Sequence, residues 1–316
     1  MIKYTYSVLN SSNNPNYVLL KYLLIIAIIY VIYAIWSKYK DAQPLAEGFS
    51  QNDAYILMKN DEIYDEFYAQ IYDEIHRPKH RITHELINII NTTKPTTRNS
   101  VFLDIGSGTG DVVKYLSDAG YQAFGLDKSH AMVEMSVKKH PDCNFKEGDV
   151  LEPMGFEHKS FSHILCTYFT IYHIKDKLSF FRNCYQWLVP NGYLVLHLID
   201  AEDFDTVSPA AKANLVANPN KYTDKKITKS IVKFENFSYN LSYDYQKITD
   251  GELCRTEIFK DEATGHVREN EEVLYVDAKE NILKIAKYAG FNLYAQFDMK
   301  SNLDDEHQYI YILERI

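Results

Sequence analysis

Residues 101–113 read VFLDIGSGTGDVV, and this stretch decides the fold. An apolar run, a glycine-rich turn and apolar residues at helical spacing predict a buried strand that turns tightly into a helix. The turn glycines, Gly106, Gly108 and Gly110, allow tight backbone angles and let a ligand approach the main-chain N–H groups. The next predicted strand, YQAFGLD, ends in Asp127, whose carboxylate can accept hydrogen bonds from both hydroxyls of a ribose. Together these features predict a nucleotide-type ligand at the turn.

Strand-like and helix-like patterns alternate as far as residue 200, with strands in CNFKEGDV, FSHILCTYF and GYLVLHLID. This rhythm predicts a mostly parallel sheet with helices on both faces. Residues 227–277 instead alternate apolar and polar side chains in three runs between glycine-containing turns, which predicts an inserted antiparallel meander. A helix ending before Gly290 and two strands, FNLYAQFDM and QYIYILERI, complete the predicted α/β fold.

Two helices are predicted ahead of the sheet. Apolar residues recur at helical spacing in residues 61–76, and Pro78 suits the first turn of a second helix that ends before Pro95. Residues 37–60 are polar and turn-rich near their start, which predicts a linker. The expected organisation is therefore a tail at 1–16, an apolar span at 17–36, this linker, and a domain at 61–316.

The apolar span reads YVLLKYLLIIAIIYVIYAIW, with Lys21 as its one charge. Twenty residues at ~1.5 Å each match the ~30 Å hydrocarbon core of a bilayer, so a transmembrane helix is predicted. A cleaved signal peptide lacks a convincing cleavage site here, and a buried core helix is the other alternative. Lys38 and Lys40 follow the span, and this positive charge favours an orientation with the C-terminal side in the cytoplasm.

The composition excludes several classes of protein. The chain has 316 residues, 46% hydrophobic and 24% charged, so a disordered or collagen-like protein is excluded. A formal net charge of −9 argues against binding to long nucleic acid. The cysteines form no C-x-x-C pair, which is typical of a reducing compartment rather than of a disulfide scaffold.

The spacing of the turn separates two classes of ligand. Dinucleotide-binding enzymes usually carry G-x-G-x-x-G, whereas this turn is G-x-G-x-G and follows Asp104. An acid at that place would repel a diphosphate but suits the ammonium group of an amino acid. With LDIGSGTG, Asp127 and EGDVLEPM in this order, the chain resembles the class I S-adenosylmethionine-dependent methyltransferases, small-molecule type. The resemblance covers about residues 101–200 and implies a Rossmann-like, seven-stranded, mostly parallel sheet.

The resemblance also implies S-adenosylmethionine as the cofactor and assigns a site. The glycine motif would surround the methionine part of the cofactor, and Asp127 would bind the ribose. The residues that follow Asp127 and those around EGDV would contact the adenine. The residues at the end of the fourth strand would border both cofactor and acceptor. The implied cofactor residues are Asp104, Gly106, Ser107, Gly108, Gly110, Asp127, Lys128, Ser129, Met132, Asp149, Val150, Thr167, Tyr168 and Phe169.

Lid elements and a base are the remaining expectations. Enzymes of this class often cover the site with N-terminal helices and inserted strands, which here are residues 61–76 and 227–277. Tyr64 and Tyr72 are candidate cofactor neighbours and Tyr72 is also a candidate catalytic residue, with aromatic packing as the alternative for either one. His173, just past the fourth strand, is the candidate base, with helix capping or a core position as the alternative. No metal site is expected, because His76, His80 and His84 lack a third-ligand pattern such as H-E-x-x-H.

The sequence thus predicts a membrane-anchored methyltransferase with a cytoplasmic catalytic domain. Its acceptor is a small molecule or a lipid headgroup, and the sequence does not choose between them. The alternative is an inactive membrane-tethered scaffold or binding protein that retains the fold. The oligomeric state is left open.

Overall fold

The computed structural model describes residues 21–33, 53–212, 220, 223 and 225–316, and the chain divides into compact units at 1–48 and 49–316. In the first unit, residues 21–33 are helical and most of their side chains are exposed. No helix among the described residues is both long and apolar enough to cross a bilayer. The tail at 1–16, both ends of the predicted span at 17–36, and most of the linker lie outside the described residues.

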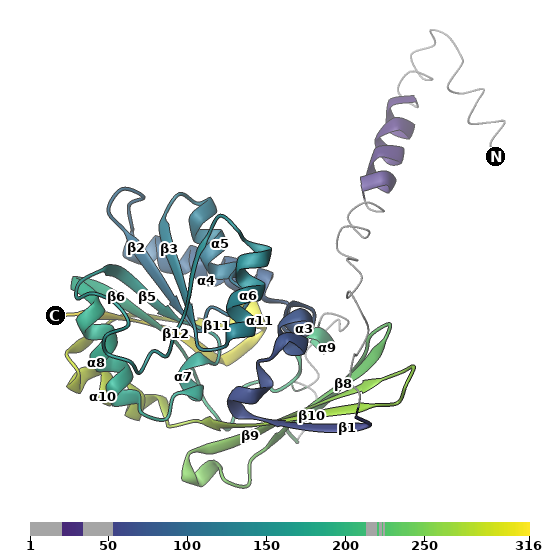
Figure 1. Ribbon diagram of the computed structural model, residues 1–316. Helices are drawn as coiled ribbons and strands as arrows, with labels where there is room; N and C mark the ends of the chain where they lie inside the picture. Colours follow the sequence, from purple (N-terminus) through teal and green to yellow (C-terminus); the bar gives the residue numbers. More distant parts are fainter. Residues whose placement is uncertain (1–20, 34–52, 213–219, 221–222, 224) are drawn as a thin grey trace. The chain divides into compact units, whose positions relative to one another are not determined.

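The larger unit is built on a seven-stranded sheet with the order β11-β12-β6-β5-β2-β3-β4 (Figure 1). Neighbouring strands are parallel except at β12, which runs antiparallel to β6 and β11. The predicted mostly parallel, Rossmann-like sheet is therefore confirmed. Its strands are β2 (Val101–Ile105), β3 (Gln122–Asp127), β4 (Asn144–Glu147), β5 (Phe161–Cys166), β6 (Leu188–Ile199), β11 (Phe291–Met299) and β12 (Asp305–Arg315).

Helices cover the sheet as the alternating pattern predicts. One apolar core joins the sheet to α4 and α5, through residues such as Ile89, Val113 and Phe102. Elsewhere, α8 packs against α10 and the strand β6 (Figure 1). The helices are α4 (Pro78–Thr93), α5 (Asp111–Asp118), α6 (His130–Lys139), α7 (Thr170–His173), α8 (Lys177–Trp187), α9 (Pro209–Lys212), α10 (Lys279–Tyr288) and α11 (Lys300–Leu303).

A second sheet has the order β1-β10-β9-β8-β7. The inserted segment forms β7 (Lys229–Lys233), β8 (Phe237–Asp244), β9 (Glu252–Asp261) and β10 (Val267–Tyr275), which pair antiparallel in sequence order, with a short 3-10 helix η3 (Ile248–Asp250) between β8 and β9. The predicted meander is present, but its first run is split into two strands. That split follows from a tight turn in which Phe234 N donates to Phe237 O at 2.9 Å.

The predicted linker at 37–60 is wrong at its C-terminal end. Residues Tyr55–Lys59 form β1, which pairs in parallel with β10 at the edge of the second sheet. The predicted helix at 61–76 also begins late, with a 3-10 helix η1 (Asn60–Ile63) followed by α3 (Glu66–His76). Asp65 sets that start, because its side chain accepts from Tyr68 N at 3.1 Å and caps α3.

Candidate active site

A cavity of about 600 Å³ lies where the carboxyl ends of β2, β3 and β5 meet, the edge at which parallel α/β sheets hold ligands. It also reaches η1, α3 and the inserted strands β9 and β10. Every sequence-predicted site residue except Gly110 lines it. These residues are Tyr64, Tyr72, Asp104, Gly106, Ser107, Gly108, Asp127, Lys128, Ser129, Met132, Asp149, Val150, Thr167, Tyr168, Phe169 and His173.

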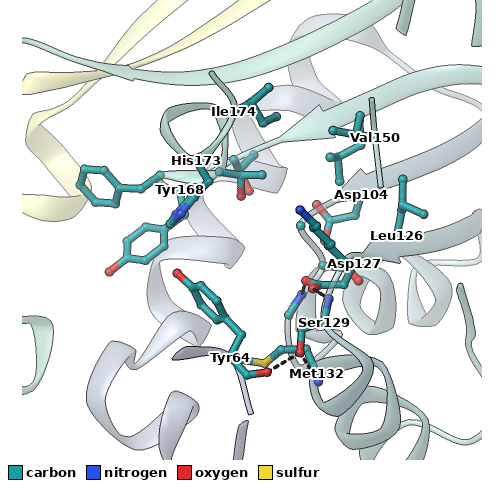
Figure 2. A pocket seen from close by; sticks show the side chains of 18 of the residues that line it. Tyr64, Asp104, Leu126, Asp127, Ser129, Met132, Val150, Tyr168, His173 and Ile174 are labelled. Atoms are coloured by element: carbon teal, nitrogen blue, oxygen red, sulfur yellow. Dashed lines mark hydrogen bonds between the residues drawn. The ribbon is translucent and has the colours of Figure 1, made fainter. Parts of the chain in front are cut away.

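Asp127 organises the glycine turn from the end of β3. Its carboxylate accepts from Gly108 N at 2.8 Å and from Ser129 N at 2.9 Å. Figure 2 shows Asp127 between Asp104 and Ser129. Burial raises the pKa of Asp127, and the backbone N–H groups of Ser129 and Gly108 counteract the rise. Asp127 therefore fixes the loop and keeps its carboxylate at the cavity, where it can accept from ribose hydroxyls.

Gly106 is required by a close contact. Its φ is 68°, and a Cβ there would lie 2.6 Å from Thr170 Cγ2 at the start of α7. Gly110 has a different role, since a Cβ there would lie 2.5 Å from Phe145 of β4. The small size of Gly110 thus lets α5 pack closely, and the structure places it outside the cavity lining.

Asp104 is a buried acid at the methionine end of the predicted cofactor site, with 3% of its surface exposed. Burial raises the pKa of Asp104 well above its ordinary value, and Arg81 opposes the rise. Beside it, Ser107 Oγ is buried without a hydrogen-bond partner among the described residues. An ammonium group at this end of the cavity would give the buried Asp104 a cationic partner, so this acid fits an amino-acid moiety.

The predicted adenine end of the cavity is bonded to the segment ahead of α3. Lys128 Nζ lies 2.7 Å from Asp61 of η1 and 3.5 Å from Asp149, and Ser129 Oγ donates to Tyr64 O (Figure 2). Met132 lies beneath this contact and is 1% exposed. The segment from η1 to α3 therefore closes over the predicted nucleotide side.

Beside His173 and Tyr64 the cavity contains two charged residues that the sequence did not predict. Glu272 of β10 lies 2.8 Å from Nδ1 of His173 and 2.5 Å from Arg255 of β9, and Tyr64 donates to it at 2.9 Å. Burial alone would raise the pKa of Glu272, but Arg255 and His173 outweigh it and lower the pKa to about 2. Both new residues line the cavity.

A signal for these residues was present in the sequence. In ELCRTEIFKD, Arg255 and Glu257 have the same strand parity as Leu253 and Phe259, and all four point inward. Charged residues on an apolar face of a strand indicate an interior site, because isolated buried charges are costly.

A second wall is formed by aromatic rings from α3 and from the exit of β5. Tyr68 donates to Glu257 at 2.9 Å, so its oxygen accepts from His76 Nε2 at 3.1 Å. Burial, Arg255 and Arg81 lower the pKa of His76 well below its ordinary value, so Nδ1 of the neutral ring accepts from Tyr168 at 3.1 Å. This chain of bonds fixes the orientation of the Tyr168 ring.

Tyr72, a predicted catalytic residue, lies against this wall. Its ring centroid is 4.4 Å from that of His76, and its Cε1 would lie 3.8 Å from a Cβ at Gly108. Burial raises the pKa of the Tyr72 phenol, so it stays protonated and cannot act as a base at neutral pH. The structure favours a packing and positioning role for Tyr72 next to the glycine turn.

We expect Arg255→Met to lower the free energy of unfolding by about 3–5 kcal/mol at pH 7, because it leaves Glu272 buried without its guanidinium partner. The pKa of Glu272 lies below its unfolded value, so this stabilisation is present above the unfolded pKa and is lost as pH falls through about 2. Urea unfolding at pH 7 and pH 3 should show the deficit shrinking in acid. Lys260→Met, on the exposed side of β9, is the control. An equal deficit at both pH values would contradict the pairing.

The sheet order, the antiparallel β12, the glycine turn after β2 and the acid ending β3 are the arrangement that the resemblance to class I S-adenosylmethionine-dependent methyltransferases implies. A sequence profile described as a methyltransferase domain matches residues 103–196. S-adenosylmethionine is the cofactor of this class, and Asp104 and Asp127, which both line the cavity, fit it.

Among curated proteins, the demethylmenaquinone methyltransferases of Chlorobaculum tepidum and Chlorobaculum parvum are each 30% identical over 96 residues. These alignments cover 30% of this chain and 39% of each relative, so the match spans about two fifths of the relatives' length.

Among solved structures, an S-adenosylmethionine-dependent methyltransferase from Clostridium acetobutylicum has a TM-score of 0.58 at 14% identity, covering 79% of this chain and 98% of its own. The methyltransferase CcbJ from Streptomyces caelestis has a TM-score of 0.59 at 15% identity, and the match covers 81% of this chain and 99% of CcbJ. CalS10, an amino pentose methyltransferase from Micromonospora echinaspora solved with S-adenosylmethionine bound, has a TM-score of 0.52 at 17% identity. The match covers 75% of this chain and 91% of CalS10. These likenesses show the fold.

Proposed function

We propose that this protein transfers the methyl group of S-adenosylmethionine to a small-molecule acceptor. The observation that carries the proposal is one cavity that joins a cofactor half, at Asp104 and Asp127, to an acceptor half, at His173 and Glu272. Its volume of about 600 Å³ lies within the range of small-molecule sites.

Bound cofactor would supply a methyl group on a positively charged sulfur, so the protein's task is binding and alignment. Asp127 would hold the ribose hydroxyls, Asp104 the amino group, and Asp149 with the backbone of Val150 the adenine. Tyr64 and Tyr72 cover the cavity from the lid and exclude water from the reacting centre.

The test is methyl transfer from cofactor labelled in its methyl group to two kinds of acceptor. Demethylmenaquinone in its reduced form is the acceptor that the name of the Chlorobaculum relatives indicates, and an amino pentose is the one that the description of CalS10 indicates. We expect labelled product from at least one of them, read by mass spectrometry. Cofactor binding without product from either acceptor or from a cell extract would favour the alternative, a scaffold that retains the fold.

We further propose that residues 17–36 anchor the domain to a membrane, with the catalytic domain on the cytoplasmic side. The apolar sequence supports this, as do the exposed apolar side chains of Tyr22, Ile26 and Tyr30 in the described helical part. Anchoring would bring a lipid headgroup or a membrane-dissolved acceptor within reach. The Lys38 and Lys40 pair supports the orientation.

Glycan acceptors test this topology. The N-x-S/T sites at Asn91 and Asn236 are exposed, and a third lies at Asn240. In a eukaryotic cell we expect all three to stay bare while the chain resists alkaline extraction from membranes. A glycosidase-sensitive mobility shift traced to any of them would contradict the orientation, and release by alkali would contradict the anchor.

A further inference from the structure

We infer that Glu272, contributed by the inserted strand β10, positions His173 as the base that removes a proton from the methyl acceptor. This inference rests on the proposed function and deepens it, because it limits the chemistry of the acceptor. It also gives the inserted sheet a part in the reaction beyond covering the cavity.

The position of His173 suits such a role. It ends α7, whose first residue, Thr170, abuts Gly106 of the cofactor turn. The His173 side chain is 31% exposed, whereas the Glu272 side chain that contacts its Nδ1 is 3% exposed. In this pair, Glu272 is therefore buried, whereas His173 is accessible from the cavity.

The surroundings of Glu272 decide the state of the ring. Arg255 and the Tyr64 hydroxyl both contact the carboxyl group, and the pKa of Glu272 is lowered to about 2, so it is a carboxylate at neutral pH. A carboxylate only accepts hydrogen bonds, so Nδ1 of His173 must donate. In a neutral imidazole Nε2 then carries a free lone pair, as a general base requires.

The other charged groups beside the pair do not take the place of Glu272 as the hydrogen-bond partner of His173. Asp127 of β3 acts on His173 electrostatically from the cofactor side, whereas Glu272 contacts Nδ1 of His173 directly at 2.8 Å. Arg255 and Tyr64 face Glu272 rather than the open side of the ring. Glu272 is thus the carboxylate that orients His173.

The proton balance then defines the acceptor class. For an O–H acceptor, the proton moves to Nε2 and the freed electron pair on oxygen forms the bond to the methyl carbon. For an N–H acceptor, the nitrogen lone pair forms that bond and a proton of the resulting ammonium moves to Nε2. In both cases the C–S electron pair stays on sulfur. The imidazolium formed is stabilised by Glu272. Acceptors with a hydroxyl, a phenol or an N–H group need this step, whereas tertiary amines and thioethers do not.

The experiment compares Glu272→Gln with Glu271→Gln, its neighbour on the opposite side of β10, which pairs with Lys59. The tautomer of His173 is read by ¹⁵N NMR of protein labelled at histidine, and the His173 signals are assigned as those missing from the spectrum of His173→Asn. We expect the Nδ1–H tautomer in the wild type and in Glu271→Gln. In Glu272→Gln we expect mixed tautomers. With whichever of the two acceptors is methylated, reduced demethylmenaquinone or the amino pentose, kcat should fall about 100-fold or more in Glu272→Gln, with the acid limb of its pH profile displaced to lower pH. Binding of S-adenosylhomocysteine should stay within about twofold of the wild type.

A wild-type spectrum with the Nε2–H tautomer would overturn the inference, and so would an unchanged kcat and pH profile in Glu272→Gln. If Glu272→Gln fails to fold, the wild-type spectrum still decides the tautomer, and Tyr64→Phe tests the same cluster through kcat. Absence of methyl transfer to any acceptor by the wild type would refute the proposed function and the proton transfer with it. An Nδ1–H spectrum would then confirm the positioning contact alone.

Discussion

Gly106→Ala is expected to abolish measurable cofactor binding, a loss of more than about 100-fold in affinity. The added Cβ would lie 2.6 Å from Cγ2 and 2.8 Å from Oγ1 of Thr170, so the turn or α7 must move. Gly106 N also anchors the turn by donating to Leu126 O at 2.8 Å. A shift here displaces the main chain that is predicted to surround the methionine part of the cofactor.

Gly265→Ala is the matched control for this change. Gly265 has a φ of 74°, close to that of Gly106, but a Cβ there meets nothing within 4 Å. Both variants therefore carry the strain of a positive φ, and only Gly106→Ala adds a contact. Calorimetry with S-adenosylhomocysteine should separate them. Equal affinities in the two variants would mean that the turn does not contact the cofactor.

Asp127→Ala should weaken cofactor binding by about 1.5–3 kcal/mol, because two ribose hydroxyls lose a charged acceptor. The substitution also frees Gly108 N and Ser129 N, which the carboxylate holds at 2.8 Å and 2.9 Å. Both effects act on the same half of the cavity, so the loss should appear in cofactor affinity.

Asp118→Ala, at the exposed end of α5, removes a carboxylate of the same kind without touching the cavity. We expect its affinity to match the wild type. Unchanged affinity in Asp127→Ala would show that the ribose lies elsewhere. Circular dichroism of both variants separates a binding defect from unfolding.

The parallel half of the fold could be predicted from sequence because its signals are local. In residues 101–127, a strand, a turn and a helix follow within a few residues of one another, and Asp127 ends the next strand. The predicted cofactor residues lie at the ends of these strands. A correct prediction of the strands therefore also predicted the positions of these residues. Gly110 is the exception, since spacing alone does not distinguish a ligand contact from close helix packing.

Non-local pairing explains what was missed. Residues Tyr55–Lys59 were predicted as linker because their strand is completed by β10, which begins at Val267. Glu272 and Arg255 were missed for a related reason, since their partners His173 and Tyr64 come from distant segments. Charged side chains on a strand are usually assigned to solvent, and only the shared parity with Leu253 and Phe259 indicated otherwise.

Calorimetric titration of the purified chain with S-adenosylhomocysteine tests the central claim most directly, because it requires no knowledge of the acceptor. The account predicts saturable binding at one site in the wild type, weaker binding in Asp127→Ala and none in Gly106→Ala. Absence of binding to the wild type at millimolar ligand, in a protein shown by circular dichroism to be folded, would contradict it.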